Sequence, residues 1–174
     1  LKRFGQPIFD GVGPLPYSQM NAMLDANYPK GALTYWKSNF LAELSDGAIE
    51  TMIACFDCCP TPMGQLLIEH LHGEVVRIAA DATAFPHRKE GYNFLVLAQW
   101  KDPGMTNTCI DWARQTYTKM QPYFSAGRYV NYLDNDEAGI AAAYGPNYRR
   151  LQQVKAKYDP PNFFRMNQNI APQS

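Results

Sequence analysis

The sequence has no excess of charge of either sign and no long apolar segment. Its 174 residues include 16 lysines and arginines and 16 aspartates and glutamates, so the formal net charge at pH 7 is zero. Without a positive field, the chain has no evident means of holding a nucleic-acid backbone or an anionic membrane surface. No run of about 18 apolar residues is present to cross a bilayer. Nucleic-acid and membrane partners are therefore not expected.

The sequence also lacks an initiator methionine, a signal peptide and a glycosylation sequon. It begins at Leu1 with Leu-Lys-Arg-Phe-Gly, which has none of the apolar stretch of a signal peptide. We therefore expect that the chain has been cut from a longer protein. The missing sequon, together with cysteines in no paired pattern, favours a reducing compartment. The expected location is the cytoplasm.

Cysteine and histidine are too few and too scattered to predict a metal site. Cys55 and Cys58 have the spacing of one zinc-binding pair, but a structural zinc needs a second pair. Neither Cys109 nor the pair His70 and His72 supplies it at a standard spacing. We expect ordinary thiols and no bound metal.

The common catalytic signatures are missing as well. The sequence contains no Gly-x-Ser-x-Gly elbow, no phosphate-binding loop and no His-Glu-x-x-His pair. It is rich in aromatic residues instead, with 11 Tyr, 9 Phe and 3 Trp making up 13% of the chain. Because tyrosine is amphipathic, such an excess suits a site that stacks on rings or sugars.

The apolar pattern predicts one α+β domain over residues 1–174, entered through a glycine- and proline-rich connector over residues 1–16. Short links between strands, one of them at Gly73, indicate antiparallel pairing, so we expect an antiparallel sheet covered by helices on one face. Helices are predicted over residues 17–24, 46–59, 106–120, 138–144 and 148–158. Strands are predicted over residues 32–41, 66–72, 75–80, 92–100 and 128–133.

Three motifs follow one another in the last part of the chain. They are Tyr129-Val130-Asn131-Tyr132, then Tyr144-Gly145-Pro146-Asn147 with Arg150-Leu151, then Lys155-Ala156-Lys157-Tyr158-Asp159-Pro160. In this order they resemble the carboxy-terminal segment of berberine-bridge-enzyme-like oxidases, which here corresponds to residues 127–174. Upstream, Thr83-Ala84-Phe85-Pro86-His87-Arg88 and Tyr35-Trp36-Lys37-Ser38 also resemble the substrate domain of that family. The resemblance therefore covers most of the chain.

This resemblance implies the organisation of the whole protein. Family members have an amino-terminal FAD-binding domain and a substrate domain whose sheet roofs the flavin. The chain resembles the substrate domain, so FAD is expected as a cofactor held mainly by the protein's own amino-terminal domain, which this chain lacks. The whole enzyme would oxidise a hydroxyl-bearing small molecule such as a sugar, an alcohol or an aromatic natural product. This part alone is expected to be inactive. The alternative is a non-catalytic, aromatic-lined ligand-binding domain of the same fold.

The resemblance also assigns roles to residues of this sequence. Tyr132 is expected to be the general base that takes a proton from the substrate, and such a tyrosine needs a neighbouring cation or hydrogen-bond donors. Alternation along a strand would turn Asn131 away from Tyr132. The resemblance further implies that Asn131 and Tyr129 contact the flavin. It implies that the substrate is contacted by Asn93, Glu69 and Tyr35. An asparagine can only orient a substrate. The alternative that Tyr129 and Tyr132 are structural aromatics stays open.

Overall fold

The computed structural model describes residues 5, 10–133 and 139–173, which divide between two compact units, Leu1–Ala32 and Leu33–Ser174. The first unit contains helix α1 (Tyr17–Ala22) and the 3-10 turn η1 (Asp25–Asn27), neither of which has a buried residue. Residues 1–4 and 6–9 of the connector predicted over residues 1–16 lie outside the described residues. The single domain predicted for residues 1–174 stays a prediction. All six candidate site residues belong to the second unit.

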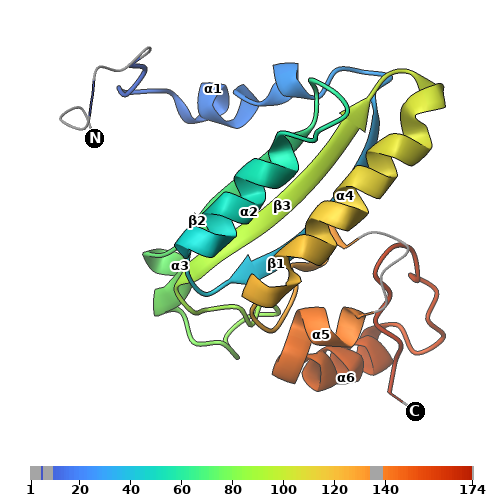
Figure 1. Cartoon of the computed structure of the whole chain (residues 1–174). Coiled ribbons are helices and arrows are strands. Elements are labelled where there is room, and N and C mark those ends of the chain that lie inside the picture. The colour runs from blue at the N-terminus through green and yellow to red at the C-terminus, as the bar shows by residue number, and fades with distance from the viewer. Residues whose placement is uncertain (1–4, 6–9, 134–138, 174) are drawn as a thin grey trace. The chain divides into compact units, whose positions relative to one another are not determined.

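The second unit is built on a three-stranded antiparallel sheet with the order β1-β3-β2 (Figure 1). Its strands are β1 (Leu33–Leu41), β2 (Gln65–Leu71) and β3 (Gly91–Trp100). The central strand β3 is buried along almost its whole length, and its residues from Phe94 to Ala98 are not exposed at all. A strand with a neighbour on each side and cover on both faces reads as a continuous apolar run. The predicted α+β class with an antiparallel sheet is confirmed.

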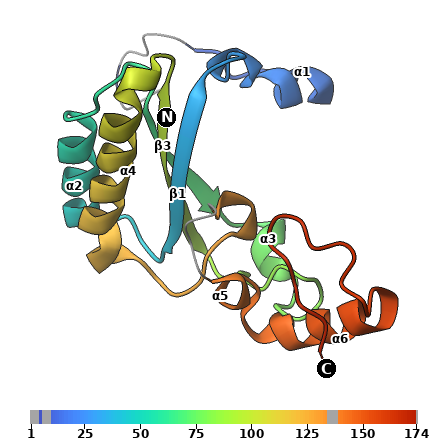
Figure 2. The same ribbon diagram turned by 90° about the vertical axis from the view of Figure 1, so that its right-hand side faces the viewer.

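Helices α2 (Asp46–Phe56) and α4 (Thr106–Met120) cover one face of this sheet (Figure 2). The core between them contains Phe94, Val96 and Trp100 from β3. Ser45 marks the start of α2, because its Oγ accepts a hydrogen bond from the amide of Ala48 at 3.3 Å. The predicted bounds of α4 are those of the structure.

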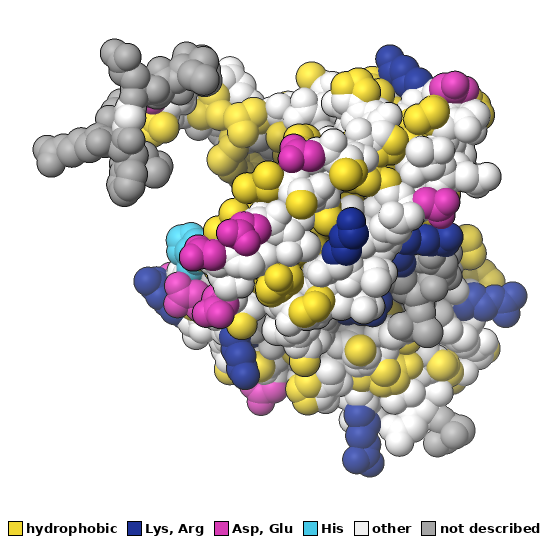
Figure 3. Space-filling view, in the orientation of Figure 1, with side chains coloured by type: hydrophobic (Ala, Val, Ile, Leu, Met, Phe, Trp, Pro, Cys, Tyr) yellow, Lys and Arg dark blue, Asp and Glu magenta, His cyan; other side chains and the backbone are white. Residues whose placement is uncertain are grey.

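The outer face of this helical layer mixes apolar and charged side chains. Ile49, Ile53 and Phe56 of α2 are 39%, 57% and 49% exposed, while the smaller Ala48 and Cys55 face the sheet. Basic and acidic side chains are interspersed on the face that Figure 3 shows. In the part of the chain that the structure describes, no helix has the length and apolar character needed to cross a membrane.

Two predicted strands are wrong. The segment predicted as a strand over residues 75–80 begins with the short helix α3 (Glu74–Arg77), and the carbonyl of Val75 accepts a hydrogen bond from Arg88 instead of a neighbouring strand. The segment 128–133 forms the 3-10 turn η4 (Val130–Tyr132), closed by a bond from the amide of Tyr132 to the carbonyl of Tyr129 at 3.0 Å. At both places other hydrogen bonds replace those that a strand would form with a neighbouring strand.

The last part of the chain forms α5 (Ile140–Tyr144), the 3-10 turn η5 (Gly145–Asn147) and α6 (Tyr148–Tyr158), which lie beyond one end of the sheet, on the side away from α2 and α4 (Figure 2). Asn147 ties this part to the loop before β3, since its Nδ2 donates to the carbonyls of Ala80 and Thr83 at 2.7 and 3.0 Å. The loop and the tail therefore hold one another over the sheet face opposite α2 and α4.

Candidate functional site

A pocket of about 550 Å³ lies on the sheet face opposite α2 and α4. Its floor is a row of three side chains, one from each strand: Phe40 of β1, Asn93 of β3 and Glu69 of β2. Asn93 is directly opposite Phe40 on one side and Glu69 on the other. Residues opposite one another in antiparallel strands project from the same face, so the register itself assembles this row.

The walls of the pocket are largely aromatic. Tyr132 meets Tyr129 at 5.1 Å between ring centroids, and Tyr129 meets Phe85 at 5.7 Å, both in edge-to-face geometry. This is a preferred arrangement for aromatic pairs. Phe85 comes from the loop before β3, whereas both tyrosines come from the segment at η4. The wall therefore brings together residues that are far apart in sequence.

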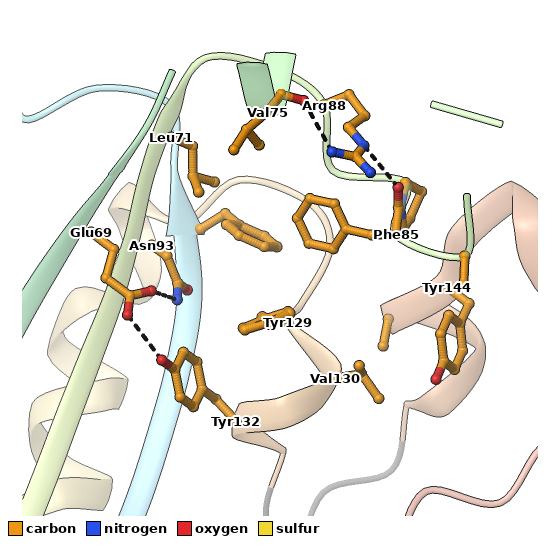
Figure 4. A pocket seen from close by; sticks show the side chains of 14 residues that line it. Glu69, Leu71, Val75, Phe85, Arg88, Asn93, Tyr129, Val130, Tyr132 and Tyr144 are labelled. Atoms are coloured by element: carbon orange, nitrogen blue, oxygen red, sulfur yellow. Dashed lines mark hydrogen bonds between the residues drawn. The ribbon is translucent and has the colours of Figure 1, made fainter. Parts of the chain in front are cut away.

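Glu69 forms two hydrogen bonds, one to Asn93 within the floor and one to Tyr132 in the wall (Figure 4). The hydroxyl of Tyr132 donates to its Oε1 at 2.9 Å, and Nδ2 of Asn93 donates to its Oε2 at 2.7 Å. Each carboxylate oxygen thus has one donor. Both bonds hold the Glu69 carboxylate in place, and the bond from Tyr132 gives the phenolic proton an acceptor. Three predicted site residues are brought together in this network.

Arg88 braces the loop that carries Phe85. Its guanidinium donates to the carbonyls of Phe85 and Val75, each at 3.2 Å, and to Oγ1 of Thr83 at 2.7 Å. It also lies over the Phe85 ring, 4.9 Å from the centroid. In the part of the lining that the structure describes, Arg88 is the one cationic residue, and its guanidinium is bound to the loop.

The remaining candidates lie in different places. Tyr129 lines the pocket, but Asn131 lies beside a neighbouring cavity of about 520 Å³ and donates from Nδ2 to the Tyr129 hydroxyl at 2.8 Å. The predicted position of Tyr35 in the cleft is corrected. Its side chain is buried against α4 on the other sheet face, where its hydroxyl accepts a bond from Nε of Arg114 at 3.1 Å.

Sequence reasoning gave no role to several residues that shape the pocket. Phe85 and Arg88 belong to the motif Thr83-Ala84-Phe85-Pro86-His87-Arg88, which resembles the family's substrate domain, but the motif gave neither residue a function. Phe40 carries no motif, and only its even-numbered place on β1, shared with Trp36, could have indicated its face.

Cys59, Cys109 and Asp159 lie outside the pocket, and each has a pKa away from its ordinary value. Burial raises the pKa of the Cys59 and Cys109 thiols, and a hydrogen bond from Lys155 lowers the pKa of Asp159. All four cysteines are free thiols. Within the described ranges, no three His, Cys, Asp or Glu side chains group as a metal ion would require. The expected lack of a metal stays a prediction.

Taken together, the fold and the site define an α+β domain with an aromatic, hydrogen-bonded pocket on the sheet face opposite its two long helices. The family model described as berberine and berberine like matches residues 128–171. An FAD-linked oxidoreductase of Dictyostelium discoideum is 31% identical over 99% of this chain and 38% of its own length. Tetrahydroberberine oxidase of Berberis wilsoniae is 30% identical over 89% of this chain and 33% of its own length.

Solved structures agree on the fold. A berberine bridge enzyme variant described as a reticuline dehydrogenase covers 91% of this chain with a TM-score of 0.81 at 21% identity, over 39% of its own chain. Berberine bridge enzyme from Eschscholzia californica covers 82% with a TM-score of 0.76 at 23% identity, over 33% of its own chain. The chain belongs to the berberine-bridge-enzyme-like family of FAD-linked oxidoreductases. It spans between a third and two fifths of the length of these relatives.

Proposed function

We propose that the whole protein is an FAD-dependent enzyme that oxidises a hydroxyl-bearing small molecule, with this chain as its carboxy-terminal substrate domain. The names of the relatives support the reaction class, since they include an FAD-linked oxidoreductase and an oxidase. The observation that carries the proposal is the hydrogen bond from Tyr132 to Glu69 in the wall of the pocket. FAD would be held mainly by an amino-terminal domain of the same protein.

Tyr132 and Glu69 act as one base in this proposal. The substrate hydroxyl gives its proton to the Tyr132 oxygen while the phenolic proton passes to Oε1 of Glu69, along the bond of 2.9 Å. The relay avoids a free phenolate, which a tyrosine with a pKa of about 10 would otherwise need. Asn93 keeps the carboxylate oriented through its bond to Oε2. FAD, when bound, supplies the acceptor for the hydride removed from the substrate carbon.

The pocket fits part of FAD. The aromatic side chains of the pocket and the Tyr129 hydroxyl suit a flavin ring, and Tyr129 would contact it together with Asn131, which lies beside the neighbouring cavity and bonds to that hydroxyl. The diphosphate does not fit in the same way. Among the described residues that line the pocket, Arg88 is the only cation, and its guanidinium is already bound to the loop. The residues of this chain therefore suit the ring and leave the diphosphate to another part of the protein.

Replacing Tyr132 by Phe tests the proposal in the full-length enzyme. The change removes the hydroxyl and keeps the ring, so anaerobic flavin reduction by a substrate should slow by about two to four orders of magnitude. Tyr117→Phe is the matched control, because Tyr117 is a buried tyrosine on the helix-covered face whose hydroxyl accepts a bond from Asn39. A Tyr132→Phe enzyme that keeps the wild-type rate would place the base elsewhere.

One observation favours a second candidate, a ligand-binding domain without catalysis. Glu69 is exposed in this chain, and a base that water can reach is less well preorganised than one in a closed site. Visible absorption of the full-length protein separates the two functions. A bound flavin that bleaches with a substrate supports the oxidoreductase, whereas a colourless protein supports the binding domain.

A further inference from the structure

Asn93 is a buried polar residue of the pocket floor with one hydrogen-bonding group unused. Its side chain amide donates from Nδ2 to Glu69, while Oδ1 has no hydrogen-bond partner among the described residues. The residue is only 1% exposed. Buried acceptors in folded proteins nearly always have a partner, and an exception in the lining of a pocket calls for an explanation.

The orientation of this amide is fixed by chemistry. An ionised carboxylate can only accept hydrogen bonds, so the group that faces Oε2 of Glu69 must be the NH₂ of Asn93. A flipped amide would set two acceptors against each other. Oδ1 is therefore left facing away from Glu69, and Figure 4 shows the end of the Asn93 side chain turned toward the part of the pocket that Glu69 and Tyr132 border.

The unused acceptor lies next to the base. Tyr132 and Asn93 bind the two oxygens of one carboxylate, at 2.9 and 2.7 Å, so the phenolic oxygen and the amide border the same part of the pocket. A ligand that gives one hydroxyl proton to Tyr132 can offer a second hydroxyl to Asn93 only if its two hydroxyls are also neighbours. Vicinal diols have this geometry, and sugars and polyols contain it.

We propose that Oδ1 of Asn93 accepts a hydrogen bond from a second hydroxyl of the substrate, so that the pocket selects vicinal diols of the sugar and polyol class over lone alcohols. The proposal rests on the proposed function, because it takes Tyr132 as the base. The ring of Phe85 in the pocket wall supports it, since aromatic rings pack against the C–H faces of a sugar. A lone alcohol would leave the buried acceptor without a partner, which lowers its binding.

The test uses the full-length holoenzyme and paired probes. D-glucose and D-galactose are each compared with their 2-deoxy analogues, which lack the hydroxyl next to the reacting carbon, and benzyl and cinnamyl alcohols serve as lone alcohols. Anaerobic flavin reduction gives kcat/KM, and the change in the flavin spectrum on titration gives Kd. The wild-type enzyme should prefer a sugar over its 2-deoxy analogue by about 10- to 100-fold.

Asn93→Leu keeps the approximate size of the side chain and removes the acceptor. It should bring the ratio of sugar to 2-deoxy sugar to about 1, whatever its effect on the absolute rate. Asn39→Leu is the matched control, because it removes a buried asparagine from the helix-covered face, where Nδ2 of Asn39 donates to Tyr117, and it should keep the wild-type ratio. The wild-type ratio decides the question alone if Asn93→Leu does not fold.

The outcomes separate the two claims. Flavin reduction by the lone alcohols but by none of the sugars, or by a sugar and its 2-deoxy analogue equally, would overturn the diol subsite and leave the proposed oxidoreductase standing. A flavin that is reduced by dithionite but by no probe would count against the proposed function and the diol subsite together. A loss of discrimination in Asn39→Leu as large as in Asn93→Leu would show that Oδ1 of Asn93 is not the determinant.

Discussion

The ring of Tyr132 lies parallel to the ring of Trp36, with 2° between the planes and 5.9 Å between the centroids. Trp36 belongs to β1, on the same face as Phe40, so the sheet provides a flat support for the turn that carries Tyr132. The ring of Tyr129 meets the ring of Tyr132 edge-on. The direction of the Tyr132 hydroxyl is therefore set by ring packing as well as by its bond to Glu69.

Replacing Trp36 by Leu should loosen Tyr132 without removing it. The phenol would lose its parallel neighbour and sample more orientations, and misplacement of a catalytic group is costly. We expect flavin reduction in the full-length enzyme to slow by about 10-fold, measured by anaerobic stopped flow. Trp112→Leu is the control, since Trp112 packs on the other face and bonds to the carbonyl of Cys55. That variant should lose stability while its rate changes little. Equal rates for wild type and Trp36→Leu would contradict the support role.

Tyr132 and Glu69 should behave as a unit in a double-mutant cycle. Tyr132→Phe removes the hydroxyl that passes the proton on, and Glu69→Gln removes the carboxylate that takes the proton up. Either change therefore interrupts the same relay. Groups that act together show strongly non-additive effects. We expect the double variant to be about as slow as the slower single variant, by the same stopped-flow measurement. Two effects that multiply would mean that the residues act independently.

The strands of the sheet were predictable, but the pocket face was not. Alternation along β1 correctly separates Tyr35 and Lys37 from Trp36 and Ser38, yet both sets contain aromatic and polar residues and both faces are covered. Polarity contrast usually tells the inner from the outer face of a strand. On β1 this contrast between the two faces is missing. The sequence therefore predicts Tyr35 in the cleft, whereas its side chain packs against α4.

The segment that carries Tyr132 shows a different limit of sequence reasoning. Aromatic and β-branched residues over 128–133 favour a strand by propensity, but β-propensity depends on having a partner strand. The ring of Tyr132 packs on the rings of Tyr129 and Trp36, and the backbone closes a local turn. The family resemblance located these residues where local propensity gave the wrong element.

Gly127 precedes this segment and should not tolerate a side chain. Its φ is +100°, and a Cβ there would lie 2.4 Å from Cε1 of His87, whose Nε2 donates to the carbonyl of Ala143 at 2.9 Å. Gly73 is the matched control, because its φ is also positive, at +64°, but no atom lies within 4 Å of its Cβ position. Both alanine variants carry backbone strain, and Gly127→Ala also displaces His87. It should destabilise the protein by about 1 to 3 kcal/mol more than Gly73→Ala in thermal or chemical unfolding. Equal losses would show that only strain matters.

Asp159, which directly follows α6, should make the stability of the protein depend on pH in the acid range. Its carboxylate is bonded to Lys155 and accepts the amides of Phe163 and Phe164 at 2.8 and 3.0 Å. The Lys155 bond, helped by these amides, holds the pKa of Asp159 below its ordinary value. The ionised form is therefore favoured in the folded chain. Its contribution to stability is complete above the unfolded pKa of about 4 and is lost as the pH falls through the folded pKa.

Asp159→Asn tests this dependence, because it keeps the shape of the side chain and removes its charge. The melting temperature of the wild-type protein should exceed that of Asp159→Asn at pH 7, and the difference should shrink as the pH is lowered below about 4. Glu74→Gln provides the control, since Glu74 forms an exposed pair with Arg77 and such pairs contribute little. A difference between wild type and Asp159→Asn that stays constant from pH 7 into the acid range would show that the side chain acts through the geometry of its hydrogen bonds alone, since only an ionisation can make its contribution depend on pH.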